Sequence, residues 1–234
     1  MSIKERLEEV ENRIRKSADR AGTDRSQIKL LAVTKTHSVE DIKEALAAGL
    51  EYIGENRVQE AELKIPELTG LYKEFHYIGH LQGNKINKLL TLQPDLIHSI
   101  DNLSIVEKLN TRLAAQNRKQ EILLQVNTSG EASKFGVAPQ AALETAGRIM
   151  EYSNIQLRGL MTIGKFTDNE QELRTSFRVL RELRDQMRNL YPEQDLKWLS
   201  MGMSNDFEIA IEEGSNLLRL GTVLFGMRAC AMRN

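Results

Sequence analysis

The sequence predicts an α/β protein, a (β/α)8 barrel of the TIM type with one extra helix at its N-terminus. Short apolar segments recur about eight times along the chain, and segments rich in helix formers separate them. Repeated strand and helix units predict a parallel sheet, because parallel strands need a crossover that is usually helical. No Gly-x-Gly-x-x-Gly follows the first apolar segment, which argues against an open dinucleotide-binding sheet. We therefore expect the strands to close into a barrel.

The individual elements follow from spacing and capping signals. A first helix is expected over residues 3–22, where apolar residues recur at helical spacing: Ile3, Leu7, Val10 and Ile14. Ser38 is expected to cap a second helix, which ends near Gly49, and the longest helix is expected over 168–190. The predicted strands are 29–34, 51–54, 75–79, 95–100, 121–127, 157–163, 197–201 and 217–222.

Composition and charge indicate one globular domain spanning residues 1–234. The 32 basic and 33 acidic residues are spread along the chain and give a net charge of −1, which argues against nucleic-acid binding or a membrane-surface patch. No apolar stretch is long enough to span a membrane, and the chain opens on a charged amphipathic pattern, so we expect a cytoplasmic protein. Cys230 has no partner cysteine, and the four histidines show no metal-ligand spacing. We expect a free thiol and no metal.

Lys35 is the first candidate for chemistry, because it follows the apolar run of the first predicted strand. Ligands bind where barrel strands end. A lysine there loses hydration, so its pKa falls towards the range in which a neutral amine attacks an aldehyde and forms a Schiff base. Most lysines at strand ends are solvated, so Lys35 needs support from other residues.

That support comes from the last two predicted strands, where barrels commonly bind phosphate. Ser204 opens a helix-like segment, so its hydroxyl and the nearby backbone N–H groups suit a phosphate dianion, although a plain N-cap is the better explanation when the residue is taken alone. Arg219 precedes the Gly221-Thr222 step, whose backbone and hydroxyl can approach an anion closely. Together with Lys35, these residues predict a site for a phosphorylated aldehyde, and pyridoxal phosphate is the obvious candidate.

Five segments of the chain carry a family resemblance. They are 32–36 (AVTKT), 54–57 (GENR), 76–85 (HYIGHLQGNK), 200–204 (SMGMS) and 219–228 (RLGTVLFGMR), and residues 126–136 add a sixth. In order and spacing they resemble the pyridoxal phosphate homeostasis protein family over nearly the whole chain. The resemblance implies a fold-type III barrel like the N-terminal domain of alanine racemase, with pyridoxal phosphate held as an internal aldimine.

The resemblance also implies roles for single residues. It places the Schiff base on Lys35 and the cofactor phosphate on Ser204 with Gly221 and Thr222. It places Arg219 against the pyridine nitrogen, which then stays unprotonated because an arginine does not give up its proton. Asn56 and His76 are expected to line the cofactor ring, although either residue can be an ordinary buried hydrogen-bonding group.

Two functions remain open at this point. The resemblance implies a carrier or regulator of pyridoxal phosphate (PLP) that balances vitamin B6 and amino-acid or keto-acid pools. It also implies a monomer, with apo PLP-dependent enzymes as candidate partners. The alternative is an amino-acid racemase, which needs a base on each face of the cofactor. None of the five tyrosines falls in a clear strand-end motif except Tyr77, whose side chain should point away from that of His76. A phosphosugar enzyme with Glu55 or Glu131 as acid/base explains Lys35 less well.

Overall fold

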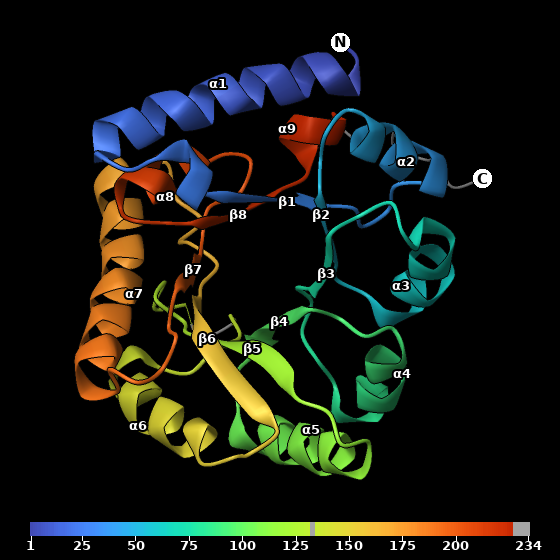
Figure 1. The fold of residues 1–234 in the computed structure, drawn as a ribbon. Coiled ribbons are helices and arrows are strands. Elements are labelled where there is room, and N and C mark those ends of the chain that lie inside the picture. Colours follow the sequence, from blue (N-terminus) through green and yellow to red (C-terminus); the bar gives the residue numbers. More distant parts are fainter. Residues whose placement is uncertain (132–133, 227–234) are drawn as a thin grey trace.

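The computed structural model is a closed barrel of eight parallel strands surrounded by helices (Figure 1). It describes residues 1–131 and 134–226. Each strand pairs with the next along the chain, and β8 pairs with β1 to close the sheet. The strands are β1 Lys29–Val33, β2 Tyr52–Glu55, β3 Glu74–Tyr77, β4 Leu96–Ile100, β5 Gln120–Gln125, β6 Ile155–Met161, β7 Trp198–Ser200 and β8 Leu217–Leu220. The predicted barrel and its eight strands are confirmed.

Helices follow the strands around the outside of the barrel, and one helix precedes them. The α-helices are α1 Ile3–Ala21, α2 Val39–Ala47, α3 Val58–Lys64, α4 Ile86–Thr91, α5 Leu103–Ala115, α6 Pro139–Met150, α7 Glu170–Leu190, α8 Phe207–Glu212 and α9 Thr222–Phe225. Short 3-10 turns lie at Arg25–Gln27, Ile65–Leu68 and Gly83–Lys85. None of the described helices is long and apolar enough to cross a membrane.

Capping follows the sequence signals at both ends of α2. Ser38 caps α2 with a capping box, in which its hydroxyl accepts from Asp41 N and its own N–H donates to the Asp41 carboxylate. Gly49 lies one residue beyond the C-cap of α2 with φ +111°. Two expectations are wrong. The helix α8 begins at Phe207, so Ser204 is not its N-cap. The expected core-facing stripe of the longest helix does not extend to Leu190, which is exposed at the end of α7. The thiol expected at Cys230 lies outside the described residues.

Both faces of the strands are buried, which explains why they are continuous apolar runs instead of alternating ones. Inward-facing side chains fill the barrel with an apolar layer: Leu31, Leu96, Leu123, Met161 and Leu217. Outward-facing side chains pack against the helices, for example Leu30 and Ala32 of β1. The barrel is therefore packed inside, and ligands have access only at its two ends.

The helix α1 covers the seam at which β8 meets β1 (Figure 1). Its buried stripe packs with side chains of α8, β8 and α9 in one apolar cluster: Ile3, Leu7, Val10, Ile14, Ala18, Phe207, Ile211, Leu218, Leu220 and Leu224. The predicted N-terminal helix is thus confirmed, and its function in the fold is to cover the joint between the first and last strands.

Candidate functional site

Lys35 lies at the C-terminal end of the barrel, in the turn that joins β1 to α2. It comes two residues after Val33, the last residue of β1, and is half-buried. The next residue, Thr36, has φ +66°, the left-handed conformation that a β-branched residue rarely adopts. A conformation of this kind persists only where the surroundings hold it.

A buried ion-pair cluster holds the turn on both sides of Lys35. The Lys64 ammonium donates to Thr34 O at 2.9 Å and pairs with Glu55 Oε1 at 2.9 Å and Glu60 Oε2 at 3.0 Å. The Thr36 N–H donates to Glu60 Oε2 at 2.8 Å. We call these residues, Thr34, Glu55, Glu60 and Lys64, the Lys64 cluster. It fixes the residues immediately before and after Lys35, and sequence reasoning did not find it.

Glu55 is the most deeply buried member of the Lys64 cluster, with 1% of its side chain exposed. One carboxylate oxygen accepts from Thr34 and Lys64, and the other has no hydrogen-bond partner. Burial raises the pKa of this carboxyl, against the opposing effect of Lys64 and Thr34. The carboxylate is buried against Lys64 and Thr34, where it stabilises the turn that carries Lys35. It therefore does not face the mouth of the barrel as the acid/base of a phosphosugar enzyme would.

The loops after β7 and β8 meet at the same end of the barrel. The Ser204 hydroxyl accepts from the Val223 N–H of α9 at 3.3 Å, which connects the two loops directly. Gly221 stands at the start of α9, next to the end of β1, where an added Cβ would lie 3.4 Å from Val33 O. Ser204, Gly221 and Thr222 are therefore close in space, as the sequence predicts for residues that hold a phosphate.

Arg219 enters the barrel interior from β8 and is 5% exposed. Its guanidinium donates to Ser200 Oγ at 2.7 Å and to Thr162 O at 2.8 Å. Burial lowers its pKa to about 10, while the charge of Asp206 opposes that shift. The group is therefore a cation at neutral pH, and in the described part of the chain it makes no ion pair with a carboxylate.

Asn56 follows β2, next to the turn that carries Lys35, since Val33 pairs with Gly54 in the sheet. Its side-chain oxygen is buried and has no hydrogen-bond partner. Buried polar atoms are rarely left in this state, so an unpaired oxygen at a barrel mouth is available to a ligand. Gly79 packs so tightly against this residue that an added Cβ would lie 1.9 Å from Asn56 O.

His76 lies deeper than the other predicted residues. It is fully buried, and its ring nitrogens bond to His98 at 2.9 Å and to Glu74 at 2.7 Å. Two side chains, His98 and Ser200, separate it from Arg219. Tyr77 points out of the barrel, where its hydroxyl lies 3.5 Å from Asn56 O, and burial raises its pKa to about 12.

The structure therefore brings six of the seven predicted residues to one mouth of the barrel and places His76 below them. The six are Lys35, Asn56, Ser204, Arg219, Gly221 and Thr222. The predicted site left out residues of the strands, of the segments after β6 and before α8, and of one outer helix that support these six: Glu74, His98, Ser200, Thr162, Asp206 and Lys64. The sequence signal that could have identified several of them is a charged or polar residue within an apolar strand, because such a residue is buried only when it has a hydrogen-bonding partner.

Comparison with known proteins identifies the family. Residues 6–229 match the model of the alanine racemase N-terminal domain. The pyridoxal phosphate homeostasis protein of Aquifex aeolicus is 43% identical over 97% of this chain and 99% of its own length. The corresponding protein of Vibrio cholerae is 41% identical over 97% of both chains. This chain belongs to the pyridoxal phosphate homeostasis protein family.

Solved structures agree with this assignment. PipY of Synechococcus elongatus, solved with PLP bound, is 33% identical and superimposes with a TM-score of 0.82 over 96% of this chain and all of its own. An unknown protein from Bifidobacterium adolescentis is 37% identical, with a TM-score of 0.90 over 95% of this chain and 94% of its own. The alanine racemase of Corynebacterium glutamicum shares the fold at 14% identity and a TM-score of 0.70, and 63% of its length is matched.

Proposed function

We propose that this protein binds pyridoxal phosphate reversibly at the C-terminal mouth of its barrel, and that it serves vitamin B6 homeostasis and amino-acid and keto-acid balance without robust catalysis. The observation that carries the proposal is the convergence of Lys35, Ser204 and Arg219 on one mouth, in a chain whose 33% identical relative PipY was solved with PLP bound. The names of its curated relatives support the homeostasis function.

The donor groups at this mouth fit the cofactor. Ser204 and Thr222 supply hydroxyls for the phosphate at the start of α9, where the Val223 N–H donates to Ser204 Oγ. Lys35 supplies an amine for the aldehyde, and the unpaired Asn56 oxygen supplies an acceptor. When bound, pyridoxal phosphate supplies the aldehyde and an electron-accepting ring.

Arg219 decides what such a site does best. Because a guanidinium only donates hydrogen bonds, a pyridine nitrogen facing Arg219 accepts one and carries no proton of its own. The ring then withdraws electrons weakly, which favours holding the cofactor over carbanion chemistry. A racemase would need a second base on the opposite face of the ring, and Tyr77, the tyrosine considered for this task, points out of the barrel.

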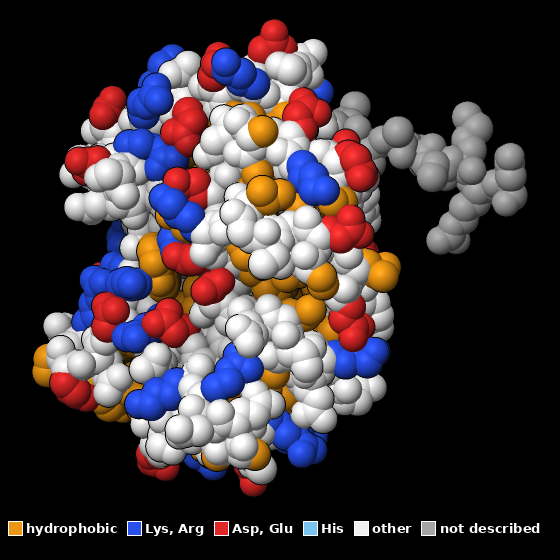
Figure 2. All heavy atoms as spheres, turned by 45° about the vertical axis from the view of Figure 1, so that its right-hand side comes forward, with side chains coloured by type: hydrophobic (Ala, Val, Ile, Leu, Met, Phe, Trp, Pro, Cys, Tyr) orange, Lys and Arg blue, Asp and Glu red, His pale blue; other side chains and the backbone are white. Residues whose placement is uncertain are grey.

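The proposal extends to the surroundings of the protein. We infer that residues 1–234 form one domain, that the protein acts as a monomer in the cytoplasm, and that apo PLP-dependent enzymes are candidate recipients of the cofactor. On the face shown in Figure 2, basic and acidic side chains are intermingled, which supports the expectation that nucleic acid is not a partner.

An absorbance titration with pyridoxal phosphate, followed by borohydride reduction and peptide mapping, tests the proposal. We expect a visible band and a reduced pyridoxyl adduct on Lys35. Lys35→Ala should lose the band and the adduct but retain phosphate-driven binding, while Lys43→Ala, on the exposed face of α2, should behave as wild type. An unchanged band in Lys35→Ala would rule out this lysine. Robust racemisation by the loaded protein would favour the racemase instead.

A further inference from the structure

A chain of hydrogen bonds runs through the barrel from Arg219 to the opposite mouth. Arg219 Nη1 lies 2.7 Å from Ser200 Oγ, which lies 2.9 Å from His98 Nδ1. His98 Nε2 lies 2.9 Å from His76 Nδ1, and His76 Nε2 lies 2.7 Å from Glu74 Oε2. We call these five residues, from β8, β7, β4 and β3, the barrel chain. Its three central side chains are fully or almost fully buried.

The chemistry of the two ends fixes the direction of every bond in the barrel chain. The His76 hydrogen bond and the Lys29 ammonium lower the pKa of Glu74 to about 2, so its carboxylate is ionised and only accepts. His76 Nε2 must then carry a proton. Because burial lowers the pKa of both histidines, each is neutral and its other nitrogen accepts.

The same direction continues to Arg219. His98 donates from Nε2 to His76, so its Nδ1 accepts the proton of the Ser200 hydroxyl. The Ser200 oxygen in turn accepts from Arg219, which can only donate. The two ends therefore demand the same orientation, and one set of tautomers satisfies every link. Such a chain is polarised from a cation to an anion, and low dielectric surroundings strengthen it.

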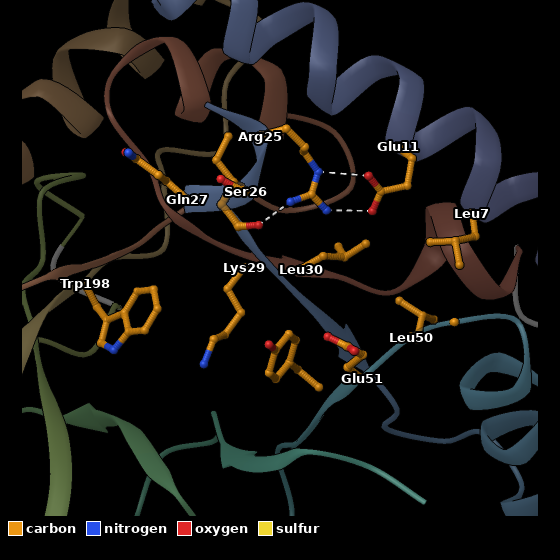
Figure 3. Close-up of a pocket in the computed structure, with 13 residues that line it drawn as sticks. Leu7, Glu11, Arg25, Ser26, Gln27, Lys29, Leu30, Leu50, Glu51 and Trp198 are labelled. Atoms are coloured by element: carbon orange, nitrogen blue, oxygen red, sulfur yellow. Dashed lines mark hydrogen bonds and ion pairs between the residues drawn. The ribbon is translucent and has the colours of Figure 1, made fainter. Parts of the chain in front are cut away.

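The far end of the barrel chain lies at the N-terminal mouth. Lys29, at the start of β1, donates to both Glu74 oxygens at 2.7 and 2.6 Å. Its ammonium also lies 4.4 Å from the centre of the Tyr52 ring and 4.7 Å from that of Trp198. Figure 3 shows Lys29 directed from β1 into a hollow of about 290 Å³ beside Trp198. A second hollow, of about 440 Å³, is lined by Lys29 and Glu74.

We propose that Ser200, His98, His76 and Glu74 are positioning residues that orient Arg219 towards the cofactor and couple the N-terminal mouth of the barrel to the cofactor site. The proposal rests on the proposed function, because it assumes that Arg219 meets the ring. It explains how a buried guanidinium without an ion-pair partner among the described residues keeps one orientation, since Ser200 and Thr162 occupy two of its donors. It also explains why His76 and His98 are buried below the mouth, where they reach Arg219 through hydrogen bonds and do not line the cofactor ring.

Two matched pairs of variants test the coupling. Ser200→Ala breaks the barrel chain beside Arg219. Ser215→Ala removes another buried serine hydroxyl, which lies within hydrogen-bond distance of the backbone oxygens of Leu199 and Met201. At the N-terminal mouth, Glu74→Gln removes the negative charge that ends the barrel chain. Glu121→Gln removes another carboxylate of this mouth, which pairs with Arg158 and does not belong to the barrel chain. Pyridoxal phosphate affinity and the absorbance of the bound cofactor are measured for all four.

We expect Ser200→Ala to raise the dissociation constant about tenfold, the scale on which supporting residues act, and Glu74→Gln to raise it roughly threefold or more. Both should shift the absorbance band, whereas Ser215→Ala and Glu121→Gln should leave it in place. If Ser200→Ala had the same dissociation constant and absorbance band as Ser215→Ala, and Glu74→Gln the same as Glu121→Gln, the proposed coupling would be overturned. A wild-type protein that binds no pyridoxal phosphate would overturn the proposed function itself, and this inference with it.

Nuclear magnetic resonance of 15N-labelled histidine tests the barrel chain without the cofactor. The wild type should show two of its four histidines neutral at pH 7, protonated on Nε2 and with a pKa below the ordinary range of histidine. Ser200→Ala should perturb the His98 signal, and Ser215→Ala should not. A buried histidine protonated on Nδ1, or one that titrates normally, would contradict the direction derived above.

Discussion

Replacing Lys64 by methionine removes the only cation of the Lys64 cluster and keeps most of the apolar stem. In the native protein the ammonium, 11% exposed, contacts a carboxylate that is 1% exposed. The variant would leave Glu55 buried with the Thr34 hydroxyl, 2.7 Å away, as its remaining side-chain donor. Removing one partner of a buried ion pair costs about 3–5 kcal/mol. We expect the free energy of unfolding to fall by about 3 kcal/mol at pH 8.

The loss should depend on pH, and its sign follows from Glu55. Burial already raises the pKa of this carboxyl above 4.5 in the folded protein, and without Lys64 it rises further. The folded variant then binds a proton that the unfolded chain has released. Stability therefore decreases as pH rises through the folded pKa, so Lys64→Met should be less damaging at pH 5 than at pH 8.

Urea unfolding at both pH values measures the effect. Glu55→Gln in the Lys64→Met background removes the unpaired charge and should restore at least half of the lost stability at pH 8. The control is Lys88→Met, which breaks an exposed 3.3 Å pair with Glu62 and should cost about 1 kcal/mol or less. The reasoning is refuted if Lys64→Met costs no more than the control, or equally much at both pH values.

Three further results are expected. In Gly221→Ala the added Cβ meets Val33 at an ordinary 3.4 Å, so urea unfolding should change little while cofactor affinity, from an absorbance titration, falls at least about tenfold. Gly79→Ala forces its Cβ to within 1.9 Å of Asn56 O and should cost about 1–3 kcal/mol in the same unfolding assay. Burial lowers the pKa of His76 and His98 from 6.5, so unfolding curves should show stability falling below about pH 6.5, by up to roughly 1.4 kcal/mol per pH unit for each histidine. Constant stability from pH 7 to 5 would contradict the last prediction.

The fold was readable from the sequence because strands buried on both faces give short apolar runs, and each run here is followed by helix formers. Strand positions were predicted to within about two residues, the accuracy with which element boundaries are usually assigned. The helix start at Phe207 was missed. Asp206 occupies the N-cap with an irregular backbone and no capping bond from its side chain, whereas Ser204 has the residue type typical of a cap.

The residues behind the mouth were harder to predict, because their partners are distant in the sequence. Lys64 looks like a surface residue of a short helix, yet its ammonium lies under the turn of Lys35. His98 and Ser200 are separated by 102 positions and meet because their side chains, from β4 and β7, both lie inside the barrel. A motif shows which residues stand at strand ends, but not which side chains of the interior touch.

The seam between β8 and β1 has a consequence for synthesis. A chain made from its N-terminus produces Lys35 well before Arg219, Gly221 and Thr222. Until then β1 lacks one neighbour, and the apolar stripe of α1 lacks its partners from α8, β8 and α9. A chain that still lacks β8 and α9 therefore cannot assemble the mouth, and any ligand that contacts both Lys35 and Gly221 binds only after these elements have been made. The binding free energy of such a ligand therefore stabilises the pairing of β8 with β1, which closes the barrel.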